Sequence, residues 1–159
     1  MGDRAQALID LAYAHQVPGF EENPGASYLW DQPNRKRFAG RPHVVDRVID
    51  MCFFGTKFRK STRLRFWHWN DPYFTSCVCH LGPFNPGSAS TDARRARHCG
   101  HTGQRHTVLS GVKDKEFATS QASAYPVPFC SALAKSFHTV ATRRRASAMY
   151  GMWKQTKLN

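Results

Sequence analysis

The sequence VVDRVIDMC at residues 44–52, followed by RLRFWHW at residues 63–69, decides which fold the chain can adopt. The first stretch is rich in β-branched side chains, which favour an extended backbone, and Gly55 then interrupts it. The second alternates basic or polar residues with apolar ones, as a half-buried strand does, and residues 70–72 end it. We therefore predict two strands joined by a short basic segment.

Helices and a further strand are predicted before this pair. Apolar residues recur at helical spacing over residues 3–15, which predicts an amphipathic helix. A very short strand at 17–22 and a turn at Pro24-Gly25 follow it. Residues 27–30 open a short helix that Pro33 limits. Strands that alternate with helices indicate the α/β class.

The sequence after the pair is less regular. Residues 81–97 are rich in Gly, Pro, Ser and Arg and have little periodicity, which predicts a long irregular loop. Residues 106–111 are a candidate for one more strand, and a helix is expected to start near Pro126 or Pro128. The basic residues 141–159 are expected to form a flexible tail.

The chain is strongly basic for its length. Its 159 residues hold 23 Lys and Arg against 11 Asp and Glu, a formal net charge of +12. Such an excess favours polyanionic partners, most often nucleic acid and less often an anionic membrane surface. No apolar run approaches the roughly 20 residues of a membrane span, and the N-terminal sequence lacks the pattern of a secretory signal. We expect an intracellular protein, cytoplasmic or nuclear.

A run of cations and aromatic residues spans residues 52–67 and contains no acidic residue. Cations of this kind bind phosphates, and the interleaved aromatic rings either stack on bases or fill the core. The alternative is a basic strand-loop-strand unit whose rings all face inward. The candidate nucleic-acid-binding residues are Lys57, Arg59, Lys60, Arg63 and Arg65.

Cysteines and histidines gather in two short units on either side of the long loop. Zinc prefers four thiolate or imidazole ligands in a tetrahedron, and such a set would close the loop on itself. The candidate ligands are Cys77, Cys79 and Cys99 with either His106 or His101. Neither unit has the Cys-x-x-Cys spacing, so free thiols and solvated histidines are an equal alternative.

Glu22-Asn23-Pro24 follows a short apolar approach and joins an acid to an amide. Ligands of parallel α/β sheets lie beyond the carboxyl ends of the strands, where such a pair can face a flat polar ring. Asn-Pro and Pro-Gly are also ordinary turn dipeptides, so a surface turn is the alternative.

Taken in order, four segments resemble the C-terminal part of cytosine-5 DNA methyltransferase-like proteins of the phage, retroelement-associated or protist type. They are VPGFEENPGASYLW, VVDRVIDMCFFGTKFRKSTRLRFW, CGHTGQRHTVLSG and FATSQASAYPVPFCSALA, and they cover about residues 17–137. The resemblance implies a partial Rossmann-like methyltransferase sheet with flanking helices. Residues 1–140 would then form a single incomplete domain, followed by the tail at 141–159.

The resemblance also implies roles for individual residues. In the family, a Glu-Asn pair holds the flipped cytosine, and by position Glu22 and Asn23 correspond to that pair. Lys57, Lys60 and Arg63 match a segment that lies near the target base and its backbone. The Gln-x-Arg-x-Arg pattern usual in that segment is not preserved here.

Two motifs of the family are missing from the sequence. The Phe-x-Gly-x-Gly turn that binds S-adenosylmethionine is absent, and no cysteine follows a proline, so the nucleophile turn is absent too. Cytosine C5 needs a covalent thiolate adduct before it can be methylated. The chain alone is therefore expected to bind no S-adenosylmethionine and to transfer no methyl group, and a separate chain that carries the N-terminal half is a conceivable partner.

We thus expect an inactive C-terminal part of a methyltransferase-like protein with residual affinity for nucleic acid, DNA rather than RNA. Two other functions stay open: a small basic structural or RNA-binding protein of a ribonucleoprotein, and a zinc-binding interaction module.

Overall fold

A three-stranded antiparallel sheet forms the centre of the computed structural model, which describes residues 2–69, 76–79, 99–107, 112–113, 116–117 and 124–156. The strands are β1 (Gly19–Pro24), β2 (Val44–Asp50) and β3 (Ser61–Trp67), in the order β1-β3-β2. β3 is the central strand, and the basic-apolar alternation of its sequence gives it two different faces, both of which are covered.

The helices and short elements follow the chain in a simple order. Before β2 come α1 (Gly2–Ala14), the 3-10 helix η1 (Tyr28–Asp31) and α2 (Pro33–Ala39). The 3-10 helix η2 (Met51–Phe54) directly follows β2, and β4 (Val112–Lys113) pairs with β5 (Glu116–Phe117) in a separate small ladder. The long helix α4 (Val127–Thr156) ends the described chain.

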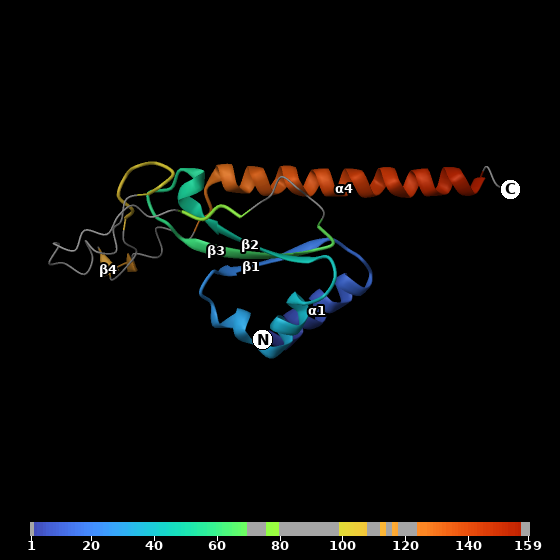
Figure 1. Cartoon of the computed structure of the whole chain (residues 1–159), viewed down its shortest axis with the longest axis horizontal. Helices are drawn as coiled ribbons and strands as arrows, with labels where there is room; N and C mark the ends of the chain where they lie inside the picture. Colours follow the sequence, from blue (N-terminus) through green and yellow to red (C-terminus); the bar gives the residue numbers. More distant parts are fainter. Residues whose placement is uncertain are drawn as a thin grey trace.

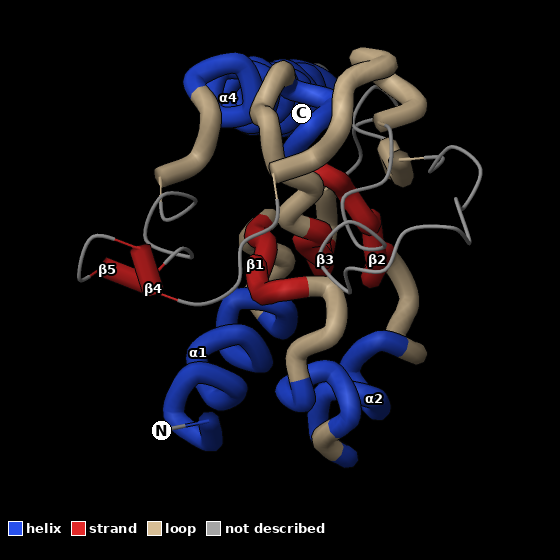
Figure 2. The backbone as a smooth tube through the Cα atoms, turned by 90° about the vertical axis from the view of Figure 1, so that its left-hand side faces the viewer, coloured by secondary structure: helices blue, strands red, loops and turns tan. Residues whose placement is uncertain are grey.

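The elements form three layers. Helix α4 lies over one face of the sheet, and α1 and α2 lie beneath the other (Figure 2). The C-terminal half of α4 extends well past the sheet (Figure 1). Among the described residues, no helix combines the length and apolar character needed to cross a membrane.

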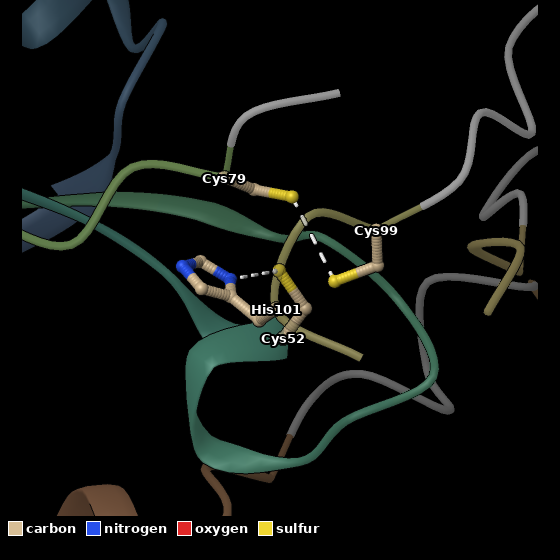
Figure 3. A group of neighbouring side chains, drawn as sticks. All are labelled: Cys52, Cys79, Cys99 and His101. Atoms are coloured by element: carbon tan, nitrogen blue, oxygen red, sulfur yellow. Dashed lines mark hydrogen bonds between the residues drawn. The ribbon is translucent and has the colours of Figure 1, made fainter. Parts of the chain in front are cut away.

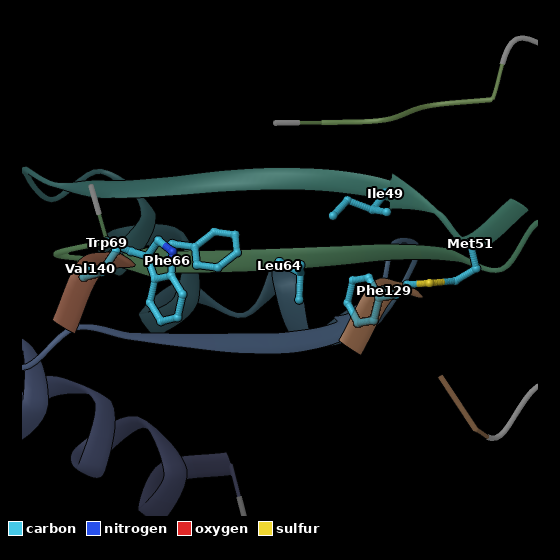
Figure 4. Packing of buried hydrophobic residues seen from close by; sticks show 7 residues of the cluster. All are labelled: Ile49, Met51, Leu64, Phe66, Trp69, Phe129 and Val140. Carbon is cyan, nitrogen blue, oxygen red and sulfur yellow. The ribbon is translucent and has the colours of Figure 1, made fainter. Parts of the chain in front are cut away.

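The face under α4 is the apolar core. Leu64 and Phe66 of β3 point into it together with Ile49 of β2, and Phe129 and Val140 of α4 close it (Figure 4). Trp69 and Met51 complete the buried cluster. The Trp69 indole N–H donates to the Ser136 hydroxyl at 2.7 Å, which satisfies the polar atom of a buried ring.

The opposite face carries a buried ionic network beside the buried aromatic rings of Trp30, Phe38 and Trp67. Arg65 donates to both carboxylate oxygens of Asp46 at 2.7 and 2.9 Å and to the Arg35 carbonyl at 2.8 Å. Arg35, also buried, pairs with Glu21 at 2.7 Å. Burial raises the pKa of Glu21, although the guanidinium groups of Arg35 and Arg65 act in the opposite direction. The Arg65 guanidinium also lies over the Trp30 ring.

Close packing at one edge of this face requires a glycine. Gly19 pairs with Trp67, and a Cβ atom at residue 19 would lie against the Trp67 indole. Only a residue without a side chain lets β1 approach β3 at this point.

The structure confirms the mixed α/β class, the helix at the N-terminus, the three strands and a helix start near Pro126. It differs in how the strands pair. The ladders that join β1, β3 and β2 are both antiparallel, so these strands do not pair as in a parallel Rossmann-like sheet, and the parallel pairing found among the described residues is an isolated bridge between Ile49 and Cys77. β1 lies at the edge of the described sheet beside β3, which separates it from β2.

Two further expectations change. Pro33 was expected to limit the short helix that opens at residues 27–30. It also begins a new helix, α2, because a proline suits the first turn of a helix. Residues 141–156 continue α4, where a flexible tail was expected. The expected loop at 81–97 lies outside the described residues, as does most of the strand expected at 106–111.

Candidate metal centre

Four side chains with metal-binding atoms converge beside the end of β2. The thiols of Cys52, Cys79 and Cys99 and the imidazole of His101 have ligand atoms that all lie within 4.8 Å of one another. They come from three separate segments of the chain and point toward a common centre (Figure 3). The three cysteines are buried and His101 is exposed, so the imidazole covers the centre on its solvent side.

Two of the six distances between these atoms match the edges of a tetrahedral site. The sulfur atoms of Cys79 and Cys99 are 3.7 Å apart, and the Cys52 sulfur is 3.5 Å from Nδ1 of His101. Zinc–ligand bonds of about 2.3 Å to sulfur and about 2.0 Å to nitrogen give edges of about 3.8 and 3.5 Å in a tetrahedron. A disulfide needs a sulfur–sulfur distance of about 2.05 Å, so these are spaced thiols.

Cys52 is positioned by the turn that follows β2. The Met51 N–H donates to the Arg59 carbonyl at 2.7 Å, and the Gly55 N–H donates to the Cys52 carbonyl at 3.0 Å. Gly55 has a φ of 86°, a left-handed conformation that glycine adopts without strain. The glycine that was expected to end the strand therefore also closes the turn that presents Cys52.

Cys79 is positioned by a segment that docks on the outer edge of β2. The Asp50 N–H donates to the Cys77 carbonyl and the Cys77 N–H to the Val48 carbonyl, which makes a short parallel bridge. The fully buried Asp50 carboxylate accepts from the Cys79 N–H at 2.7 Å and from Arg59 Nε at 2.8 Å. The Arg59–Asp50 ion pair thus helps to hold the backbone of Cys79, one of the four candidate ligands, in place.

Cys99 and His101 lie on a tight turn. The Cys99 N–H donates to the Gln104 carbonyl, and the Gly103 N–H returns to the Cys99 carbonyl, both at 2.7 Å. The Thr107 N–H donates to the Lys57 carbonyl, which joins this turn to the segment between η2 and β3.

The surroundings of the thiols favour one thiolate. Burial opposes ionisation of Cys99, but hydrogen bonds from the Thr102 hydroxyl and from the backbone N–H groups of Thr102 and His101 outweigh it and lower the pKa of Cys99 to about 5. Burial raises the pKa of Cys52, and its hydrogen bonds to Cys99 and Cys79 act in the same direction. The protein therefore stabilises one negative charge that attracts a cation.

The structure brings together only part of the predicted ligand set. Cys79 and Cys99 were predicted, and His101 was the alternative to His106. Cys77 binds β2 through its backbone and is not one of the four. His106 is buried with its Nε2 3.8 Å from the Cys79 sulfur, beside the set. The sequence reasoning missed Cys52, although its place at the end of a predicted strand was a usable signal.

The predicted nucleic-acid-binding cations have mixed surroundings. Arg65 is buried in its ion pair with Asp46, and Arg59 supports Asp50. Arg63 lies over the Trp30 ring, and Lys60 lies over the Tyr125 ring. Lys57 is exposed. Two of the five cations therefore pair closely with carboxylates of the sheet.

Glu22 and Asn23 do not form a pair. Both lie in β1, opposite Leu64 and Arg63 respectively, so the alternation of the strand places their side chains on opposite faces of the sheet. Glu22 lines a cavity of about 490 Å³ between the sheet and α4. Most of the lining is aromatic or aliphatic, from Phe20, Leu64, Trp69, Tyr125, Phe129, Cys130, Leu133, Ala134 and Phe137.

The polar groups of this cavity are few and interact with each other. Burial raises the pKa of Tyr125, and its hydrogen bond with Glu22 raises it further. The arrangement places one carboxylate and one hydroxyl among rings, which suits a flat ligand with polar edges.

Comparison of the chain with protein-family models, curated proteins and solved structures finds no significant match. The sequence contains no Phe-x-Gly-x-Gly turn and no Pro-Cys pair, and nothing among the described residues supports the binding of S-adenosylmethionine.

Proposed function

We propose that this chain is a zinc-stabilised nucleic-acid-binding domain without catalytic activity of its own, related to the C-terminal part of cytosine-5 DNA methyltransferase-like proteins. Four protein ligands complete a tetrahedron and leave no position for a substrate, so the zinc is structural. It joins η2, the segment at 76–79 and the turn at 99–104, which are far apart in the sequence.

The surface of α4 is the observation that carries the nucleic-acid part of the proposal. The helix has five Lys and Arg residues and no Asp or Glu over its 30 residues. Its length, about 45 Å at 1.5 Å per residue, exceeds that of the sheet. The exposed Arg143 and Arg144 lie where the helix passes the end of the sheet, and the exposed Arg145 follows them. A basic helix without acidic residues that extends past the sheet suits the phosphates that border a groove.

Binding to duplex DNA is expected to fall steeply with salt. If Lys57, Lys135 and the three arginines at 143–145 each neutralise one phosphate, the slope of log K against log salt is about −4.5. Between 50 and 200 mM salt, the affinity then falls about 500-fold. Fluorescence anisotropy over this range measures the slope.

The triple substitution Arg143→Gln, Arg144→Gln and Arg145→Gln should reduce the slope by about 2.7, because three counterion-releasing contacts are removed. An affinity that does not change with salt, or a triple variant with the wild-type slope, would contradict the proposal. A double-stranded RNA of the same length tests the ribonucleoprotein alternative.

The cavity beside Glu22 favours a second element of the proposal, the binding of an unstacked base. The resemblance assigns Glu22 to the edge of a flipped cytosine, and the cavity supplies aromatic walls and a Tyr125 hydroxyl around that carboxylate. Asn23 lies on the other face, so Glu22 would act without it. β1 is an edge strand of the described sheet, and an outer edge of this kind can accept a strand from a partner chain.

Glu22→Gln is expected to weaken binding to an oligonucleotide with one unpaired cytosine by about tenfold relative to the same oligonucleotide with an abasic site there, since one good base contact contributes about 1–3 kcal/mol. Asp31→Asn is the matched control, because it removes one exposed negative charge outside the cavity. Equal ratios for Glu22→Gln and wild type would exclude the base-binding role and leave backbone binding intact.

A further inference from the structure

A cationic hollow lies at the other end of the sheet from the metal centre. His43 immediately precedes β2 and His68 immediately follows β3, so the antiparallel pairing brings the two residues together, while Cys52 lies beyond the opposite end of β2. The His68 N–H donates to the His43 carbonyl at 3.0 Å, and the two rings have centroids 5.6 Å apart.

The hollow is formed where α4 passes this end of the sheet. It has a volume of about 380 Å³, and a neighbouring hollow of about 190 Å³ shares His68 and Arg144 with it. No carboxylate lines either hollow among the described residues. The residues that line one or both are His43, Val45, His68, Trp69, Val140, Arg143, Arg144 and Ser147.

Both histidines have a backbone conformation that residues other than glycine rarely adopt. The φ angle is 59° at His43 and 49° at His68, in the left-handed region. Such a backbone costs energy at a residue with a Cβ atom and persists only where the surroundings impose it. The strained backbone at these two residues, which are neighbours in space, places both imidazoles beside the hollow.

Contacts from α1 fix the His68 ring. Its Nε2 is 3.0 Å from the Tyr13 carbonyl oxygen, to which it donates, and the ring stacks on that of Tyr13 with centroids 4.7 Å apart. His68 therefore forms a rigid wall, whereas His43 and Arg144 are the side chains that can move onto a ligand.

We propose that Arg144, with His43 and His68 beside it, binds a phosphate group of a nucleic-acid backbone in this hollow. A planar guanidinium can donate two parallel hydrogen bonds to phosphate oxygens, and an imidazole adds a third donor from the side. The hollow is open enough for a phosphate in a chain, and free phosphate has the same chemistry. The inference rests on the proposed function and adds a fixed anchor point for the nucleic acid on α4.

The test uses the full chain and two probes, inorganic phosphate and duplex DNA. In a titration of 15N-labelled protein with inorganic phosphate, the ring signals of His43 and His68 should shift, and Arg144→Gln should weaken this binding at least tenfold. Arg37→Gln removes the same charge from an exposed residue of α2, on the other face of the sheet, and should leave phosphate binding unchanged. For duplex DNA at 100 mM salt, Arg144→Gln should reduce affinity several-fold more than Arg37→Gln.

The two probes separate this site from the proposed function. Phosphate-dependent shifts without DNA binding at low salt would keep the hollow as a site for free phosphate and overturn both its assignment to a nucleic acid and the proposed function. DNA binding that Arg144→Gln and Arg37→Gln weaken equally, with no shift of the histidine rings, would keep the proposed function and remove the site.

Discussion

Removal of zinc, or the substitution Cys79→Ser, is expected to lower the melting temperature of the protein by about 10 °C and to abolish the binding of one zinc ion per chain. At a free zinc concentration 1,000 times the dissociation constant, binding stabilises the folded state by about 4 kcal/mol. For a chain of this size, each kcal/mol corresponds to about 2–4 °C. Circular dichroism melts and atomic absorption measure the two quantities.

The reason for so large an effect is that the metal joins three segments of the chain that are far apart in the sequence. Cys79 and Cys99 form a small buried cluster with Cys52, separate from the apolar cluster under α4. Without a cation, two buried thiols and the negatively charged thiolate of Cys99 remain close together, which opposes folding of this region.

Matched variants make the test specific to the four ligands. Wild-type protein without zinc and Cys79→Ser should melt at the same temperature, and adding zinc should stabilise only the wild type. Cys130→Ser changes an exposed cysteine outside the centre and should retain one zinc ion. Retention of zinc by Cys52→Ser, with its loss from Cys77→Ser, would show that the ligand set is the one first predicted from the sequence.

The two histidines are separated in the same way. His101→Ala should weaken zinc binding far more than His106→Ala, because the imidazole of His101 completes the tetrahedron. The opposite order would place His106 in the site, since it is already 3.8 Å from the Cys79 sulfur.

Local sequence patterns predicted the secondary structure well and its arrangement poorly. Each of two strands was predicted from residues close together in the sequence, one from the β-branched residues at 44–49 and the other from the alternation at 63–69. Which strands lie side by side depends on contacts between distant residues, so the central position of β3 was not predicted. The separation of Glu22 from Asn23 was not predicted either, because the strand was expected to end at Glu22. β1 continues to Pro24, and consecutive residues of a strand face opposite sides.

Two other differences have physical causes of the same kind. Residues 141–156 were predicted to form a flexible tail because of their charge, although alanine, arginine and methionine are among the strongest helix formers. The cations at 57–65 were predicted to bind nucleic acid because of their number, whereas the availability of each cation depends on its partner. Arg65 pairs with Asp46, and Arg59 pairs with Asp50, only in the folded sheet. Cys52 joins its distant co-ligands only through the docking of 76–79 on β2.

Asp46→Ala is expected to destabilise the protein by about 3 kcal/mol, because it leaves the buried Arg65 guanidinium without a carboxylate. The Arg65 side chain is 3% exposed, and the Asp46 side chain is 34% exposed. The penalty for losing a partner depends on the burial of the charge that remains. Arg65→Met should therefore cost less than Asp46→Ala, since water can solvate the remaining carboxylate and Arg63 lies 4.0 Å from it.

Urea denaturation of the two single variants and the double variant measures this asymmetry. The double variant Asp46→Ala, Arg65→Met should recover part of the stability lost in Asp46→Ala, because it removes the unpaired charge and places an apolar side chain beside Trp30. Asp31→Ala breaks an ion pair with Lys36 in which both side chains are more than 60% exposed, and it should change stability by less than about 0.5 kcal/mol. Equal, small losses for Asp46→Ala and Asp31→Ala would mean that water reaches Arg65 when Asp46 is removed. In that case Trp30 and the neighbouring side chains, and not the ion pair, hold η1 and α2 on this face of the sheet.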